Sequence, residues 1–267
     1  MDAGLTWSEA MSWTHQERGV IAEEHFSTSI DVGAQVARLV MRRCQEVAEE
    51  CGIDRPWIVD IGAGSGRLLG QLLALGFPAD RLLGVDVRPA PDLPVRWIQG
   101  VAPACLPPVH GLAFAHEFLD DIPADVVRDG RILGTDGAPG PSASPEQLAW
   151  VQQWGDGVCG LTRDEAWRQI VDRVVVGEAI AVDFSGGDPV GHRRGRRGAW
   201  GADICAGVDF RSLRARTGGR VVPQHRLFPD HPVLGDPAGL GGFLWLTVTR
   251  PDAGRADNPS PSPTTAG

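Results

Sequence analysis

A stretch of small and acidic residues between positions 57 and 86 has the residue types and spacing of a nucleoside-binding site. An apolar run, Trp57 to Ile61, is followed by Gly62, Gly64 and Gly66 at alternate positions. Glycine allows a sharp turn and lets a ligand approach the main chain, because it has no Cβ. A second apolar run ends at Asp86, 20 residues after Gly66, where an acid can accept hydrogen bonds from both ribose hydroxyls. The spacing predicts an adenosyl group bound after the first strand.

The same segment argues against two other glycine-loop ligands. The dinucleotide fingerprint requires glycine or alanine at the sixth position counted from Gly62, where this chain has Arg67. A phosphate-binding loop requires a lysine, and the chain contains none. The three-glycine form resembles motif I of class I S-adenosylmethionine (SAM) methyltransferases, which implies SAM as the cofactor. The alternative interpretation is a glycine turn without a ligand in an α/β fold.

A second group of acids, Glu117, Asp120 and Asp121, follows the fourth predicted strand. Ligands of open α/β sheets bind outside the carboxyl ends of the strands, so these acids should face the crevice of the glycine loop. Carboxylates favour a nearby sulfonium and hold a guanidinium through bidentate hydrogen bonds. We expect Glu117 and Asp120 to be catalytic, orienting the methyl acceptor and removing its proton. A solvated acidic turn is the alternative interpretation, and the preferred one for Asp121.

Four segments resemble the MidA family of SAM-dependent methyltransferases. The most specific is His116–Pro123, which resembles the family's Asn-Glu-Phe-x-Asp-Ala-x-Pro motif. The others are Phe26–Ser29, similar to a Phe-x-Thr-Ser-Pro turn, Ala181–Gly186, similar to an Ile-Asp-Tyr-Gly strand end, and Gly201–Phe210, similar to a Gly-x-x-Asp-Leu-Thr-Ala-His-Val-Asp-Phe segment. The resemblance implies methylation of a protein arginine side chain. A small-molecule O- or N-methyltransferase and a non-catalytic SAM-binding assembly factor are the alternatives.

The expected cofactor contacts combine the glycine loop with the N-terminal turn. Gly62, Ala63, Gly64 and Gly66 would line the methionine and ribose, Asp60 would order the loop, and Asp86 would hold the ribose. Thr28 and Ser29 would contact the methionine carboxylate or act as a lid. His116 would stack on or hydrogen-bond the cofactor, or simply finish its strand. Asp183 is expected at the acceptor, whereas Asp203 and Asp209 are equally consistent with capping.

The elements that must position these residues alternate between strand and helix, which is typical of an α/β fold. We expect a Rossmann-like, seven-stranded, mostly parallel sheet with helices on both faces, the class I methyltransferase fold. The strands are predicted at 57–61, 82–86, 95–98, 110–115, 178–184, 220–224 and 243–249. The helices are predicted at 31–51 with Asp31 as N-cap, at 66–75, and at 162–174, opened by a capping box and stopped by Gly177. Residues 134–145 and the basic stretch 192–197 are expected to be loops.

Three parts of the chain are predicted: an N-terminal helical lid or substrate region (1–55), a SAM-binding domain (56–250) and a disordered tail (251–267). The net charge of −9 disfavours nucleic acid as a partner. A protein or a small molecule is expected as methyl acceptor, and the sequence does not indicate an oligomeric state. The apolar runs are too short for a membrane span, and the N-terminus lacks a signal peptide, so a cytoplasmic protein is expected. The five cysteines lack a Cys-x-x-Cys pair, which argues against a metal site.

Overall fold

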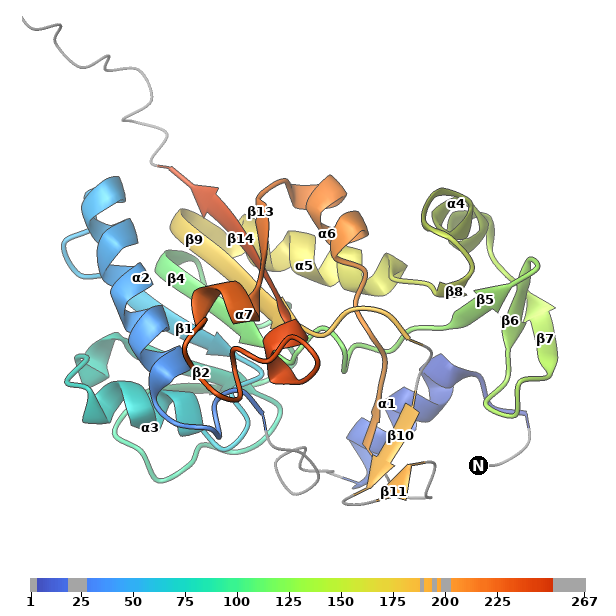
Figure 1. The fold of residues 1–267 in the computed structure, drawn as a ribbon, viewed down its shortest axis with the longest axis horizontal. Helices are drawn as coiled ribbons and strands as arrows, with labels where there is room; N and C mark the ends of the chain where they lie inside the picture. Colours follow the sequence, from blue (N-terminus) through green and yellow to red (C-terminus); the bar gives the residue numbers. More distant parts are fainter. Residues whose placement is uncertain (1–3, 19–27, 188–189, 194–195, 198–202, 252–267) are drawn as a thin grey trace, which may run out of the picture.

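The computed structural model describes residues 4–18, 28–187, 190–193, 196–197 and 203–251. Its centre is a seven-stranded sheet in the order β13-β14-β9-β4-β1-β2-β3 (Figure 1). The bounds are β1 Trp57–Ile61, β2 Leu82–Asp86, β3 Arg96–Gln99, β4 Val109–His116, β9 Val174–Asp183, β13 Arg220–Pro223 and β14 Leu244–Arg250. Only β14 runs antiparallel to its neighbours in this sheet. The predicted α/β class and mostly parallel sheet are confirmed.

Helices cover both faces of the sheet, because its central strands carry buried residues on both sides. Helices α2 (Gln35–Cys51) and α3 (Arg67–Ala74) pack on the face that carries Ile58 and Phe114. Helices α5 (Leu161–Arg173) and α6 (Phe210–Thr217) pack on the opposite face. Short segments complete the domain: the 3-10 turns η2 Ala79–Arg81 and η3 Leu240–Gly242, and helix α7 Gln224–Leu227.

Two small sheets are attached beyond the carboxyl ends of β4 and β9 (Figure 1). The first has the order β7-β6-β5-β8 and packs against α4 (Pro145–Trp154). Its strands are β5 Val126–Arg128, β6 Arg131–Leu133, β7 Pro139–Ser142 and β8 Gly157–Val158. The second has the order β11-β10-β12 and lies beside α1 (Trp7–Arg18). Its strands are β10 Val190–Arg193, β11 Arg196–Arg197 and β12 Asp203–Cys205. Both additions follow strands whose ends face the expected crevice.

Several predicted boundaries were wrong, and in each case a tertiary contact or turn explains the difference. Helix α2 begins at Gln35, because the Asp31 carboxylate accepts a hydrogen bond from the Thr28 N–H and closes a turn there. Helix α5 has Gly160 as N-cap, and the Thr162 hydroxyl donates to the Pro123 carbonyl, so no capping box forms. That helix ends at Arg173, and Gly177 lies inside β9.

Two stretches predicted as loops contain strands. Residues 139–142 form β7, paired with β6, and a capping box at Ser144 and Gln147 opens α4 directly after it. The basic stretch 192–197 contributes to the antiparallel pair β10–β11. Among the described helices, none is long and apolar enough to cross a membrane. Residues 252–267 of the predicted tail lie outside the described part of the chain, and the division into three parts stays a prediction.

Glycine allows three strands to approach closely at one level of the sheet. Trp57, Gly111 and Gly177 are register partners on β1, β4 and β9. Gly111 and Gly177 have φ values of +136° and +127°. A Cβ on Gly177 would lie 1.9 Å from the Gly111 carbonyl oxygen, and one on Gly111 would lie 2.3 Å from that of Trp57. These two glycines therefore set the register of the strands that carry the site.

Replacing Gly177 with alanine is expected to lower the free energy of unfolding by about 3 kcal/mol. The positive φ costs about 1–2 kcal/mol, and the clash with the neighbouring strand adds about 1–3 kcal/mol. Gly76→Ala is the matched control, since Gly76 has φ +88° but no atom within 4 Å of the added Cβ. Urea unfolding measures both, and equal losses in the two variants would contradict the close approach of β4 and β9.

Candidate active site

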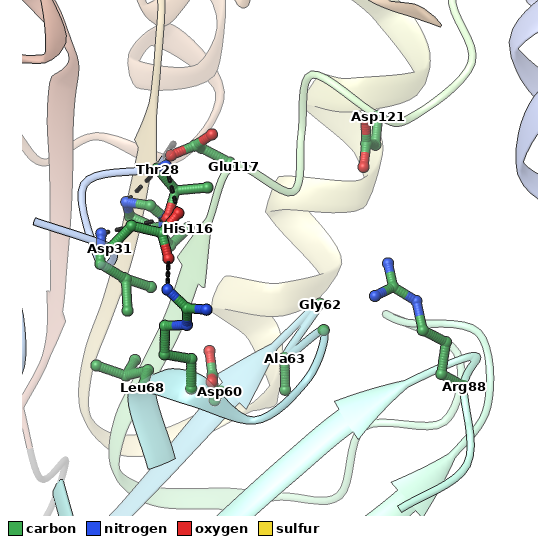
Figure 2. Close-up of a pocket in the computed structure, with 13 residues that line it drawn as sticks. Thr28, Asp31, Asp60, Gly62, Ala63, Leu68, Arg88, His116, Glu117 and Asp121 are labelled. Atoms are coloured by element: carbon green, nitrogen blue, oxygen red, sulfur yellow. Dashed lines mark hydrogen bonds and ion pairs between the residues drawn. The ribbon is translucent and has the colours of Figure 1, made fainter. Parts of the chain in front are cut away.

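A cavity lies over the glycine loop at the carboxyl ends of β1 and β4. This is the switch point of the sheet, where chain order reverses on either side of β1 and ligands of such folds bind. The predicted residues that line it are Thr28, Asp60, Gly62, Ala63, Gly64, His116 and Glu117. Ile30, Asp31, Arg67, Leu68, Arg88 and Asp121 line it as well. Figure 2 shows Thr28, His116 and Glu117 together on one wall, with Arg88 on the opposite side.

The glycine loop takes its shape from three left-handed residues and one acid. The φ values are +71° at Gly62, +58° at Gly64 and +77° at Gly66. Residues that have a Cβ rarely adopt this left-handed backbone conformation. The Asp86 carboxylate accepts hydrogen bonds from the Gly64 N–H at 2.8 Å and the Arg88 N–H at 2.9 Å. Asp86 is 7% exposed and does not line the cavity. In this structure Asp86 holds the loop, and Gly66 caps α3.

Asp60 is the penultimate residue of β1, beneath the loop, and it lines the cavity. Burial raises its pKa to about 7, and the nearby charge of Asp86 acts in the same direction. Removing a carboxylate from water disfavours its charged form. A cation in the cavity would reverse this shift, because an opposite charge favours ionisation.

On the cavity wall, buried His116 lies next to partly exposed Glu117. The Glu117 side chain is 21% exposed, and its backbone has φ +50°. Burial raises its pKa to about 8, with further contributions from Asp120 and Asp31, while the Ser29 N–H opposes the shift. Burial lowers the pKa of His116 to about 3, so its imidazole is neutral. His116 Nε2 lies 3.5 Å from Glu117 Oε1, and neither atom has a hydrogen-bond partner within the described residues.

The two residues of the N-terminal turn have different surroundings. Thr28 lines the cavity, whereas Ser29 is fully buried and its hydroxyl accepts a hydrogen bond from Gln224 Nε2 at 2.8 Å. The Gln224 Oε1 in turn accepts from the Trp245 indole at 2.8 Å. Ser29 therefore tethers the turn to the C-terminal part of the fold, and only its backbone N–H reaches Glu117.

Asp31 and Arg67, which both line the cavity, form an ion pair. It joins the N-terminal turn to the first residue of α3, directly behind the glycine loop. The enclosed space measures about 90 Å³, which is smaller than the roughly 300–1,000 Å³ of typical ligand pockets. Separation of Asp31 from Arg67 would widen the site, and the pair is exposed enough on the Arg67 side for water to compete.

Asp120 and Asp183 lie behind the cavity wall. Asp120 is buried and does not line the cavity. The Asp183 carboxylate accepts hydrogen bonds from the N–H groups of Leu119, Asp120 and Phe184 at 3.1, 3.3 and 3.2 Å. Burial, with Asp120 and Glu117 close by, raises the pKa of Asp183 well above its ordinary range. Asp183 shapes the turn that carries Glu117, and the structure does not place it at the cavity surface.

Arg163 is the main residue that the sequence interpretation missed. Its guanidinium is 1% exposed and donates four hydrogen bonds to carbonyl groups. The acceptors are Asp120 at 2.8 Å, Ile122 at 3.1 Å, Ala206 at 2.8 Å and Gly207 at 2.9 Å. Burial lowers its pKa, whereas Asp120 and Asp183 raise it. The sequence signal was an arginine inside an apparent capping box, a pattern that suggests an exposed helix start.

Two further predicted acids can be placed. Asp209 caps α6, accepting hydrogen bonds from the N–H groups of Arg211 at 2.8 Å and Ser212 at 3.2 Å. This agrees with the capping alternative for that residue. Asp203 begins β12, which pairs with β10. Residues 26–27 of the resembling N-terminal segment, and residues 201–202 of the Gly201–Phe210 segment, lie outside the described residues.

Solved structures of other proteins have the same fold as this chain. The chain is similar to a COG1565 superfamily member from Burkholderia thailandensis bound to S-adenosyl-homocysteine, with TM-score 0.71 and 18% identity over 92% of this chain and 88% of that chain. A second COG1565 superfamily protein from Burkholderia thailandensis has TM-score 0.69 and 20% identity over 92% and 87%. The fold is shared. No protein-family model and no curated protein sequence matches the chain.

Arg163→Met is expected to lower the free energy of unfolding by about 3–5 kcal/mol, because it leaves buried carboxylates and carbonyls without their cation. Arg168→Met on the same helix is the control, since Arg168 forms its ion pairs with Glu165 and Asp172 at the surface. Guanidinium unfolding measures both variants. Similar midpoints for Arg163→Met and Arg168→Met would contradict the organising role of Arg163.

Glu117→Gln should stabilise the ligand-free protein more at pH 8 than at pH 5. The folded protein retains a proton on Glu117 up to a pKa of about 8, whereas the ordinary value is 4.5. Between these values the unfolded chain binds fewer protons, so wild-type stability falls as pH rises, by at most about 1.4 kcal/mol per pH unit. Asp60 changes stability in the same direction but is present in both proteins.

Urea unfolding across pH 5–8 measures this difference, with the exposed Glu49→Gln on α2 as control. A constant offset between Glu117→Gln and wild type over that range would show that Glu117 is not protonated in the folded state.

Proposed function

We propose that the protein is a SAM-dependent methyltransferase similar to the MidA family, acting on an arginine side chain of a protein. The observation that carries the proposal is the position of the acid-lined cavity, over a three-glycine loop at the switch point of the sheet. The support is the shared fold of a Burkholderia thailandensis protein that binds S-adenosyl-homocysteine, which is what remains of SAM after methyl transfer.

The residues around the cavity fit SAM in shape and charge. Gly62 and Gly64 expose main chain where the methionine part of SAM would lie. Asp60 offers a carboxyl group whose ionised form the positive charge of a sulfonium would favour. Val87 and Val101, 57% and 67% exposed, follow the carboxyl ends of the adjacent strands β2 and β3. Apolar side chains exposed at neighbouring strand ends would cover the faces of an adenine ring. The Asp31–Arg67 pair must separate to admit the whole cofactor.

The bound cofactor would supply an electrophilic methyl group next to a positive sulfur. Glu117 would hold the acceptor guanidinium in line with that methyl, because a carboxylate binds a guanidinium through two hydrogen bonds. With its pKa raised to about 8, Glu117 holds a proton near neutral pH in the ligand-free protein. The charge of the guanidinium would favour the ionised form of Glu117, which could then accept a proton from the acceptor. Neutral His116, whose Nε2 lies 3.5 Å from Glu117 Oε1, would remain beside Glu117 without adding a charge. Asp120 would act indirectly, by fixing the turn that presents Glu117.

An arginine acceptor is favoured by the number of acids around the cavity. Asp31, Glu117 and Asp121 line it together with Asp60. Of the two arginines among the described residues on its wall, Arg67 is paired with Asp31, and Arg88 lies 3.6 Å from Asp86. Acids of this density attract a cationic acceptor and stabilise its localised charge. A small-molecule acceptor on the same fold is the second candidate, because this fold hosts both kinds of chemistry.

Isothermal titration with SAM should show binding to the wild-type protein and little or none to Gly64→Val. Gly64 has φ +58° in the loop that lines the cavity, and a β-branched residue cannot adopt that conformation without strain. Gly137→Val is the matched control, because Gly137 has φ +79° in the turn between β6 and β7. Absence of SAM binding by the wild type would refute every methyltransferase interpretation.

Tritiated SAM mixed with a cell lysate then separates the two acceptor classes. The proposal expects label in the protein fraction, on arginine after acid hydrolysis, and loss of that label with Glu117→Gln while SAM still binds. Label confined to small molecules would favour the second candidate. Full transfer by Glu117→Gln would contradict the role assigned to Glu117.

A further inference from the structure

A second groove lies beside the cavity, between the end of α4 and the segment that follows β9. Its walls are residues 154–158 on one side and 185–187 on the other, and its ends are formed by Gly207–Arg211 and Leu244. We call it the β8 groove, because β8 (Gly157–Val158) lies along it. Its volume is about 560 Å³, within the range of ligand-binding clefts. The proposed cofactor site does not include any of these residues.

The groove is bordered by the outer edge of a sheet. β8 pairs only with β5 in the four-stranded sheet, so its other edge is unpaired there. The Cys159 N–H donates to the Asp125 carbonyl, which makes that opposed pair a hydrogen-bonded one. Hydrogen-bonded and non-hydrogen-bonded pairs alternate in an antiparallel ladder. Val158 and Val126 are therefore a non-hydrogen-bonded pair, so the N–H and C=O of Val158 point away from β5.

Glycine residues leave the main chain exposed on both walls of the groove. Gly155 and Gly157 lie on the β8 side, and Gly186 and Gly187 lie on the β9 side. A Cβ added at any of these four positions would meet no atom within 4 Å. Exposed main chain on two facing segments is suited to another main chain, since an edge strand can pair with an extended peptide. Trp154 and Phe210 add apolar surface for its side chains.

The groove and the cavity are joined through one side chain. Arg163 donates to the carbonyl of Gly207, which lines the groove, and to that of Asp120, three residues after Glu117. Asp183, which holds the Glu117 turn, precedes the groove residue Ser185 by two positions. The Ala206 N–H also donates to the Asp120 carbonyl at 3.4 Å, and the residues that follow this pair are Gly207 in the groove and Asp121 in the cavity, so the two sites adjoin.

Charge favours a basic occupant. Asp156 is exposed on the β8 side of the groove, and Asp209 lies across from it. Arg211 binds Asp209 and also the Trp154 carbonyl, so it offsets one of the two acids. Asp156, whose carboxylate accepts a hydrogen bond from the Asp129 N–H, adds a negative charge to the β8 side of the groove, and the cofactor cavity is lined by further carboxylates. An arginine-containing segment with basic neighbours matches this distribution.

We propose that the β8 groove binds an extended, basic segment of a protein substrate, which adds to the edge of β8 and presents its arginine to the neighbouring cavity. The inference rests on the proposed function and deepens it, because it assigns the recognition of a peptide main chain to a surface distinct from the cofactor site. A free amino acid or other small acceptor would gain nothing from this groove.

The test uses a fluorescein-labelled peptide library with a fixed central arginine, five random residues on each side, and protein saturated with S-adenosyl-homocysteine. Fluorescence polarisation reports peptide binding, and titration calorimetry reports the cofactor product separately. Val158→Pro removes the N–H that points away from β5 and leaves the β5 ladder intact, since proline is tolerated at such edge positions. Val158→Ala is the matched control, because it shortens the side chain and keeps the N–H.

The expected result is a loss of at least about tenfold in library affinity for Val158→Pro, and a change of less than about twofold for Val158→Ala. Asp156→Asn keeps an oxygen for its contact with the Asp129 N–H and should weaken binding about threefold through lost charge. If Val158→Pro does not fold, as judged by its thermal transition, Asp156→Asn alone decides by the same readout.

Equal affinities of Val158→Pro and Val158→Ala would overturn the groove proposal. If Val158→Pro is unfolded, equal affinities of Asp156→Asn and the wild type would overturn it. The same holds if the library fails to bind while S-adenosyl-homocysteine still does. Failure to bind S-adenosyl-homocysteine would instead refute the proposed function, so the two outcomes are distinguishable.

Discussion

The guanidinium of Arg163 is the cation on which the carboxyl-end face of this fold depends. It is buried, and it donates to carbonyls of two segments that are far apart in the sequence, the 120–122 turn and residues 206–207. Carbonyl oxygens alone do not neutralise a buried charge, and Asp120 supplies the opposite charge nearby, with Asp183 adding to it when ionised. Its planar fork satisfies several acceptors at once, which a lysine could not do. The turn that carries Glu117 takes its position from this network.

Burial of several acids at one edge of the sheet explains the protonation expected at the cavity. Asp60, Glu117 and Asp183 all have raised pKa values, and burial is the leading cause in each case. Such groups lower the free energy of unfolding as pH rises, because the folded protein holds protons that the unfolded chain has lost. Their grouping at one edge of the sheet is typical of a binding site. A cation that enters the cavity would favour their ionised forms, which makes ligand charge and protein protonation interdependent.

The two small sheets lie next to this charged edge of the central sheet, where a substrate would make contact. The four-stranded sheet follows the Glu117 turn, and the three-stranded sheet follows β9 (Figure 1). The first contributes the free edge of β8, and the N-terminal turn closes the other side of the cavity through Asp31 and Arg67. The cofactor-side residues thus belong to the shared fold, whereas the proposed substrate-side surface belongs to the smaller sheet.

Local patterns in the sequence determined the strands, the glycine loop and the acids at the strand ends. The apolar runs at 57–61 and 82–86 match β1 and β2 residue for residue, because a buried parallel strand must be apolar on both faces. Tertiary structure decided which of those acids face the cavity: Glu117 does, Asp120 does not, and Asp86 binds the loop instead. It also decided the burial of Arg163 and the tether between Ser29 and Gln224. Each of these depends on a partner tens of residues or more away, and no local spacing records such a contact.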